Sequence, residues 1–197
     1  MRKVWRIILT AVVLMAMTAV PVTAAIQSEN LFWGGNAPAI KQPTVLSIYQ
    51  PVKPAGTKAN RADTSTPAPK LTVAEHEILL KVNRERAKAG LAPLQLNYRL
   101  VQTARAKSKD MIDHGYFDHQ SPDLGSPFDQ MKRAGIAYHY AGENIAGNNS
   151  AAGAMDSWMN SAGHRANILN PDFTHIGIGV VDGGPYGKML TQQFIGV

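Results

Sequence analysis

The segment WMNSAGHRANILN, residues 158–170, marks the point where helical patterning gives way to extended patterning. Up to the start of this segment, apolar residues recur at a helical spacing, at Ala151, Ala154, Met155 and Trp158. This spacing predicts a helix that ends before Gly163. After it, residues 175–181 have the pattern of a strand, residues 182–185 that of a turn, and residues 189–195 that of a returning strand. The C-terminal part of the chain therefore predicts a helix followed by an antiparallel hairpin.

Working outward, the preceding residues predict three further helices and one more strand. Each helix begins at a polar residue and ends at a glycine, and together they cover residues 72–90, 97–115 and 126–135. Thr72 and Glu75 form a capping-box pattern, and Ser126 followed by proline is a second helix start. Residues 138–141 are a candidate strand. Helices followed by a hairpin predict an α+β domain with an antiparallel sheet.

The first 25 residues have the pattern of a secretory signal peptide. A basic start with three positive residues precedes an apolar run at residues 7–20 and small residues at 22–25. That run is shorter than the ~20 apolar residues of a membrane-spanning helix. We expect an exported protein, secreted or associated with the cell surface or wall, with no stable membrane span after cleavage.

Residues 26–70 contain six prolines and predict an extended linker or attachment arm, whereas residues 71–197 are long enough to form one compact domain. Positive charge is concentrated outside that domain. Residues 26–70 hold five basic and two acidic residues, and residues 71–197 hold twelve of each. The domain is therefore neutral and gives no indication of a nucleic-acid surface.

The chain has no cysteine. This excludes disulfides, thiolate metal sites, a cysteine nucleophile and a lipid-modified N-terminal cysteine. Export without disulfides favours a bacterial protein, because small exported animal domains are usually cross-linked.

Three short segments carry residues suited to metal binding or acid–base chemistry. They centre on His119, Glu143 and His164, each beside an aromatic residue or a glycine. Two imidazoles and a carboxylate can hold a divalent metal such as zinc, or can exchange protons without metal. Spacing alone leaves structural roles open. His164 follows the predicted helix end, where a cation is favourable, and Glu143 precedes a possible helix start. The other histidines are predicted at exposed helix positions or in strands: His76, His114, His139 and His175.

Taken together, the segments resemble the CAP superfamily, which includes cysteine-rich secretory proteins, venom antigens and plant pathogenesis-related proteins. The matching motifs run in order through residues 71–197: NRER, GLAPL, YFDH, GENIA, WMNSAGHR and IGIG. The sequence is most similar to the cysteine-free bacterial branch. The resemblance implies an α-β-α sandwich with a central antiparallel sheet, and a cleft lined by two histidines and two acids that binds zinc or another divalent cation in some members.

Three of those four cleft residues are present by resemblance, as His119, Glu143 and His164. The position of the second acid, three residues after Trp158, is occupied by Ser161. We therefore expect any metal site to be weaker and more dependent on histidine. Asp129 is a possible substitute acid, although its position three residues after Ser126 already gives it a capping role. We further expect Gly163 to end the helix and to direct His164 into the cleft.

Three functions are compatible with these observations. The first is a module that binds a small ligand, a peptide or a cell-wall component. The second is a metal-assisted hydrolase of peptide or cell-wall substrates that uses His119, Glu143 and His164. The third is a structural protein of the cell surface or spore layer, attached through residues 26–70. The absent second acid and the lack of an identifiable nucleophile favour the binding module.

Overall fold

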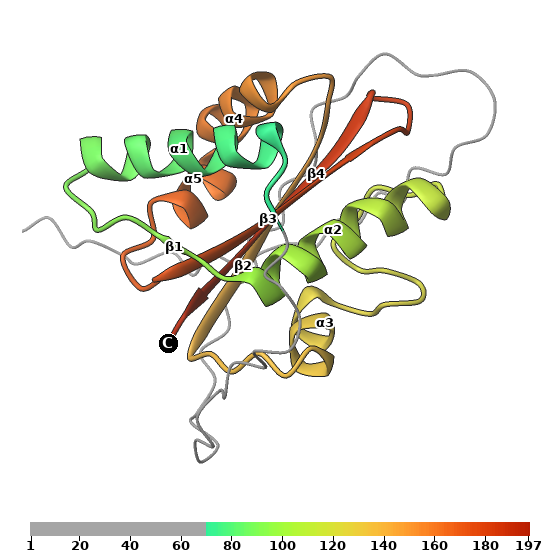
Figure 1. Ribbon diagram of the computed structural model, residues 1–197, viewed down its shortest axis with the longest axis horizontal. Coiled ribbons are helices and arrows are strands. Elements are labelled where there is room, and N and C mark those ends of the chain that lie inside the picture. The colour runs from blue at the N-terminus through green and yellow to red at the C-terminus, as the bar shows by residue number, and fades with distance from the viewer. Residues whose placement is uncertain (1–69) are drawn as a thin grey trace, which may run out of the picture.

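The computed structural model describes residues 70–197 (Figure 1). The predicted signal peptide and almost all of the predicted linker lie outside the described residues and stay predictions. Within residues 70–197, no helix has the length and apolar character needed to cross a membrane.

The described residues form five helices and four strands, joined by loops. The helices are α1 (Val73–Lys88), α2 (Tyr98–Asp113), α3 (Pro127–Arg133), α4 (Ala151–Asn160) and α5 (Ala162–Ile168). The strands are β1 (Gln95–Leu96), β2 (Tyr140–Asn148), β3 (His175–Asp182) and β4 (Lys188–Gly196). The three helix starts predicted from polar residues are confirmed, since Thr72, Asn97 and Ser126 each accept hydrogen bonds from the first turn of their helix.

The strands form one sheet in the order β1-β3-β4-β2. The hairpin pairs β3 with β4, and β4 pairs along its whole length with β2, both antiparallel. The short strand β1 joins β3 in parallel and was not expected from the sequence. Strand β2 is longer than predicted, and one of its edges is not paired with another strand of residues 70–197. This edge is where the candidate site lies.

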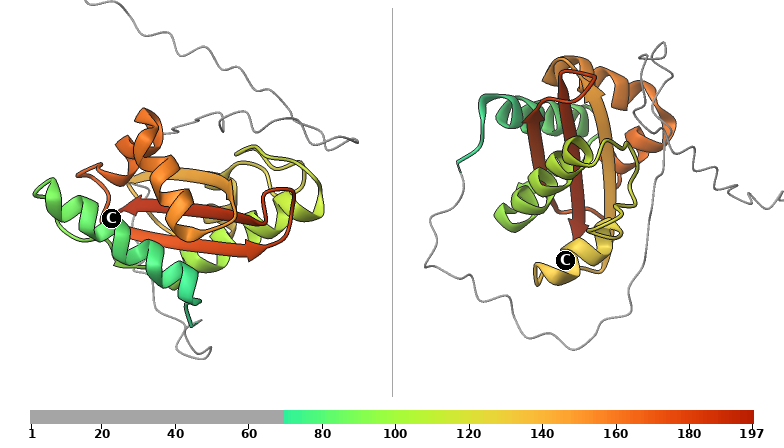
Figure 2. Two further views of the ribbon diagram at one scale, coloured as in Figure 1. Left: turned by 90° about the horizontal axis from the view of Figure 1, so that it is seen from above. Right: turned by 90° about the vertical axis from the view of Figure 1, so that its right-hand side faces the viewer.

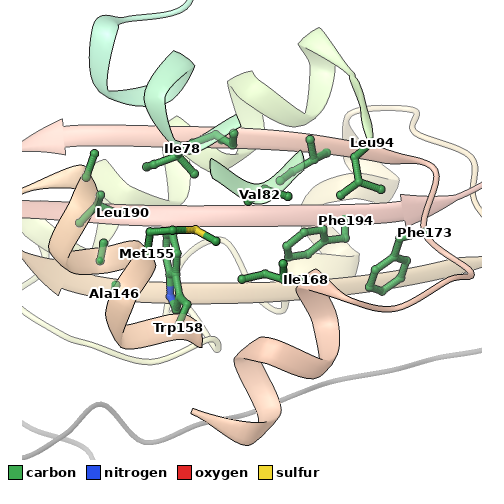
Figure 3. Packing of buried hydrophobic residues seen from close by; sticks show 14 residues of the cluster. Ile78, Val82, Leu94, Ala146, Met155, Trp158, Ile168, Phe173, Leu190 and Phe194 are labelled. Carbon is green, nitrogen blue, oxygen red and sulfur yellow. The ribbon is translucent and has the colours of Figure 1, made fainter. Parts of the chain in front are cut away.

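Helices cover both faces of the sheet, which confirms the α-β-α sandwich (Figures 1 and 2). Helix α2 lies so close to β3 that a Cβ at Gly177 or Gly179 would come within 2.2 Å of its backbone. Helices α1, α4 and α5 lie over the opposite face. There the main core joins them to the sheet through Val82, Trp158 and Phe194, among other apolar side chains (Figure 3).

The expectation that Gly163 ends the fourth helix is wrong. Helix α4 ends at Asn160, Ser161 has an extended backbone (φ −105°, ψ 122°), and α5 begins at once with Gly163 in its first turn. The chain therefore turns at Ser161, not at the glycine. Gly90, Gly115 and Gly135 do follow helix ends and have the positive φ that such positions require.

Two structural alternatives that the sequence left open for the site residues are also wrong. His164 lies near the start of α5, so it does not occupy a helix C-terminus. Glu143 lies inside β2 and precedes no helix. Neither His164 nor Glu143 therefore has the role at a helix end that the sequence left open. Both residues are buried, and this burial needs another explanation.

Candidate functional site

The three predicted site residues come from three different elements near the free edge of β2. His119 lies in the loop between α2 and α3, Glu143 lies on β2, and His164 lies on α5. All three are almost completely buried, with at most 2% of each residue exposed. Buried ionisable groups are costly unless they are paired, so each one must have partners.

His119 and Glu143 are direct partners. His119 Nδ1 lies 2.7 Å from Glu143 Oε1, and Gln193 Nε2 donates to Glu143 Oε2 over 2.9 Å. Thr103 of α2 in turn donates to Gln193 Oε1 at 2.6 Å. Both carboxylate oxygens therefore already accept a hydrogen bond, and the carboxylate is connected through Gln193 to α2. In a neutral His119 ring this arrangement places the N–H on Nδ1 and the lone pair on Nε2.

His164 has a comparable partner on its own side of the sheet edge. Its Nδ1 lies 2.9 Å from Ser161 Oγ, at the position where the resemblance implies an acid. Two amides secure the backbone nearby. Asn144 Nδ2 donates to the carbonyl oxygen of His164 at 3.1 Å, and Asn167 Nδ2 donates to Asn144 Oδ1 at 2.9 Å. Ser161 thus occupies the second-acid position and supports His164 with a hydroxyl group.

The two imidazoles share one unusual property. Among the described residues, four buried side-chain atoms have no hydrogen-bond partner, and two of them are His119 Nε2 and His164 Nε2; the others are Gln130 Oε1 and Gln192 Nε2. Burial, and to a smaller extent the charge of His119, lower the pKa of His164 to about 4. His164 is therefore neutral near pH 7 and keeps a lone pair. Buried polar atoms without a partner are rare in native proteins and often mark a site for water, an ion or a ligand.

The edge of β2 is closed to further strands by side chains from the α4–α5 side. Trp158 Nε1 donates to the carbonyl oxygen of Ile145 at 3.1 Å, and Asn167 Nδ2 donates to that of Glu143 at 3.3 Å. These bonds satisfy carbonyls that β4 does not reach. They also tie α4 and α5, and with them His164, to the strand that carries Glu143.

One buried arginine fixes the chain that follows α5. Arg86 of α1 is 1% exposed and donates to the carbonyl oxygens of Ile168, Asn170 and Phe173, at 2.9, 2.8 and 3.3 Å. These hydrogen bonds hold the C-terminal end of α5, the helix that carries His164. The sequence did not predict this role of Arg86, because Arg86 is one of several charged residues on an amphipathic helix.

The supporting amides were missed as well. Gln192 and Gln193 are adjacent amides in the largely buried strand β4, and both are fully buried. Such a pair inside a buried strand is the signal that could have identified them, because a core strand rarely takes two amides without a polar partner on each face. Asp129 has the capping role expected of it, since it accepts from Ser126 at the start of α3.

The other histidines lie where they were predicted or close to it. His76 and His114 are exposed, on α1 and at the end of α2, and His175 begins β3. His139 precedes β2 by one residue and is exposed. None of these four is joined to His119, Glu143 or His164 by a hydrogen bond within residues 70–197.

The chemistry of the donor set suits a divalent metal through nitrogen. The two free Nε2 atoms are ligands that zinc accepts, and each ring has the Nδ1 partner that metal-binding histidines usually have. Glu143 is engaged through both oxygens, so its role as a third ligand stays a prediction. Within residues 70–197, the one set of three such residues with ligand atoms within 4.8 Å of one another lies elsewhere: Asp110, His114 and Asp123.

The fold and the site define a class of protein, and comparison with known families identifies it. The model of the cysteine-rich secretory protein family, CAP, matches residues 79–194. The chain therefore belongs to this family, although it contains no cysteine. The match includes His119, Glu143 and His164 and the residues that hydrogen-bond to their side chains.

Curated relatives come from Bacillus subtilis (strain 168). The YkwD protein is 54% identical over 140 residues, which cover 70% of this chain and 53% of YkwD. The membrane protein YlbC is 39% identical over 125 residues, which cover 63% of this chain and 35% of YlbC. The chain thus aligns with about half or less of the length of these relatives.

Solved structures show the same fold. An extracellular protein with an SCP domain from Bacillus anthracis is 38% identical, with a TM-score of 0.60, covering 63% of this chain and 40% of that one. An outer surface protein of Borrelia burgdorferi has a TM-score of 0.58 at 15% identity, covering 62% of this chain and 92% of that one. The second likeness concerns the fold alone.

Proposed function

We propose that this chain is an exported binding module and that its functional centre is the buried pair His119 and His164. The observation that supports this is the pair of buried, unpartnered Nε2 atoms, each on a ring whose Nδ1 already has a partner. A purely structural histidine would use both nitrogens or expose one. The similarity to an extracellular SCP-domain protein of Bacillus anthracis supports export to the cell surface, the wall or the medium.

The ligand that best fits this pair is a divalent cation such as zinc. The two Nε2 atoms would hold it, Glu143 and Ser161 would orient the rings, and other ligand positions would stay open. Bound zinc would supply a Lewis acid that can anchor a carbonyl or carboxylate group. A small ligand, a peptide end or a wall fragment with such a group is then the expected partner.

A titration with zinc tests the proposal directly. Calorimetry on residues 26–197 is expected to show a zinc equivalent that is lost in H119Q and in H164Q. The matched control is H139Q, because His139 is exposed and is not hydrogen-bonded to the pair. Equal zinc binding by all four proteins would remove the imidazole pair as the site.

A metal-assisted hydrolase is the second candidate, and burial argues against it. Both rings are at most 2% exposed, so a cation and the end group of a ligand reach them more easily than a scissile bond in the middle of a peptide or glycan chain does. Turnover of a peptide or wall substrate that is lost in H119Q and after chelation would favour the hydrolase.

A structural surface protein is the third candidate. It depends on residues 26–70, of which only Lys70 belongs to the described residues. Release of the protein from the cell when residues 26–70 are deleted, with no effect of H119Q or H164Q on any phenotype, would favour this role over a binding module.

A further inference from the structure

A second group of metal-ligating side chains lies where helix α2 ends. Asp110 belongs to the last turn of α2, His114 is its C-terminal cap, and Asp123 lies in the loop that leads to α3. One ligand atom from each residue lies within 4.8 Å of the others. The group shares no residue with the imidazole pair.

The two carboxylates lie on either side of the His114 ring. Nδ1 is 2.9 Å from Asp110 Oδ1, and Nε2 is 2.9 Å from Asp123 Oδ2. Although desolvation acts in the opposite direction, the hydrogen bond to the Asp110 backbone oxygen and the charges of Asp110 and Asp123 raise the pKa of the His114 imidazole. The protonated ring can donate to both carboxylates. Nδ1 also lies 3.2 Å from the backbone oxygen of Asp110, which favours keeping the N–H on Nδ1 when the ring is neutral. The lone pair of Nε2 in the neutral ring then faces a carboxylate oxygen, where a cation can take the place of the proton.

The buried side of the group is held in place by its own partners. Asp110 is 6% exposed, and the hydroxyl of Tyr116 donates to its Oδ2. Lys107 Nζ donates to the same phenol oxygen at 2.8 Å, which directs the phenol proton toward Asp110. Asp110 therefore keeps Oδ1 for His114. A carboxylate that orients the far nitrogen of a histidine is the usual support of a metal-binding imidazole.

The outer side of the group is open to solvent. The side chains of His114 and Asp123 are 43% and 62% exposed. A cation and its waters can therefore approach Nε2 and the Asp123 carboxylate without rearrangement of the core. Ligand atoms around a tetrahedral zinc lie roughly 3.4 Å apart, so a shift of a few tenths of an ångström in the Asp123 loop accommodates the ion.

We propose that this group is a second divalent-cation site, with His114 Nε2 and the Asp123 carboxylate as ligands and Asp110 as the group that orients the ring. An imidazole with a carboxylate suits zinc or manganese, whereas calcium prefers oxygen ligands alone. The ion joins the end of α2 to the loop that carries His119. The site does not depend on the proposed function of the imidazole pair.

A zinc titration with matched variants tests this site in the chain from residue 26 to 197. Calorimetry counts the zinc equivalents, and the His114 ring resonances in NMR spectra report where the ion binds. H114Q and D123N are expected to weaken one equivalent at least tenfold. D113N removes the same charge from the residue next to His114. Since Asp113 is exposed and pairs with Lys109, it is expected to bind as the wild type does.

The outcomes separate the two sites. Loss of one equivalent in D123N and of another in H119Q supports both proposals. Loss in D123N with no change in H119Q supports the site at His114 and overturns the imidazole pair. Identical isotherms for D123N, H114Q and D113N, with His114 resonances that do not move on zinc addition, overturn the site at His114.

Discussion

Glu143 Oε1 lies 2.7 Å from His119 Nδ1, and both residues are at most 2% exposed. Because the second carboxylate oxygen accepts from Gln193, the carboxylate cannot turn away from the imidazole. The consequence for a neutral ring is a fixed tautomer, with the lone pair of His119 on Nε2. In the proposed site, Glu143 therefore acts on the ligand through the histidine.

Replacing Glu143 with glutamine is expected to weaken zinc binding by about 10–100-fold, the usual effect of losing a partner of a metal-binding histidine. The amide keeps the shape but removes the charge that strengthens the bond to Nδ1–H. Calorimetry on E143Q measures the change. E77Q is the control, because Glu77 is a partly exposed acid paired with Lys81 far along the chain from the site. Equal affinity in E143Q and E77Q would show that Glu143 does not tune His119.

Much of the fold follows from local patterns in the sequence. The capping residues Thr72, Asn97 and Ser126 predict three helix starts, and the hairpin pattern predicts β3 and β4. The turn at Ser161 does not follow from them. A glycine is the usual sign of a helix end, whereas a serine in extended backbone between two adjoining helices has no distinct pattern.

The site is only partly visible in the sequence. Motifs identify the two histidines and Glu143, since chemistry-bearing residues stand out beside glycine and aromatic residues. The roles of Thr103, Gln193 and Arg86 depend on contacts between residues distant in the chain, such as the 2.6 Å bond from Thr103 to Gln193. Pairing across a sheet and onto a helix decides these contacts, and a single sequence does not specify that register.

Restoring an acid at position 161 is expected to strengthen zinc binding at least tenfold. Ser161 Oγ is 2.9 Å from His164 Nδ1, and Ser161 is only partly buried, so the longer side chain of S161E has room to reach the ring or the metal. A carboxylate increases the basicity of the histidine or adds an oxygen ligand. S161Q has the same length without charge and serves as the control. Equal zinc affinities for S161E and S161Q would contradict this expectation.

The indole of Trp158 is expected to stabilise the edge of β2 through its hydrogen bond as well as its volume. W158F leaves the carbonyl of Ile145 without its donor at 3.1 Å, and an unsatisfied buried group costs about 1–3 kcal/mol. The smaller ring also leaves a cavity, so a total loss of about 2–4 kcal/mol in the free energy of unfolding is expected. Urea denaturation measures it.

Y98F is the control for W158F. Tyr98 is 45% exposed, and loss of its hydroxyl is expected to change the free energy of unfolding by less than about 0.5 kcal/mol. A W158F protein as stable as Y98F would mean that the indole bond contributes nothing and that α5 and Asn167 alone close the strand edge.

His164 makes stability depend on pH in a defined direction. Its folded pKa of about 4 lies below the ordinary value of 6.5, so the unfolded state binds the proton more tightly. Stability of the metal-free protein is therefore expected to rise by ~3 kcal/mol as pH increases from about 4 to about 6.5, and then to stay level. H164Q lacks this contribution, so urea denaturation from pH 4 to pH 7 should give it a flatter profile than the wild type. Parallel profiles would mean that His164 is protonated in the folded state at mildly acidic pH, with its Nε2 donating.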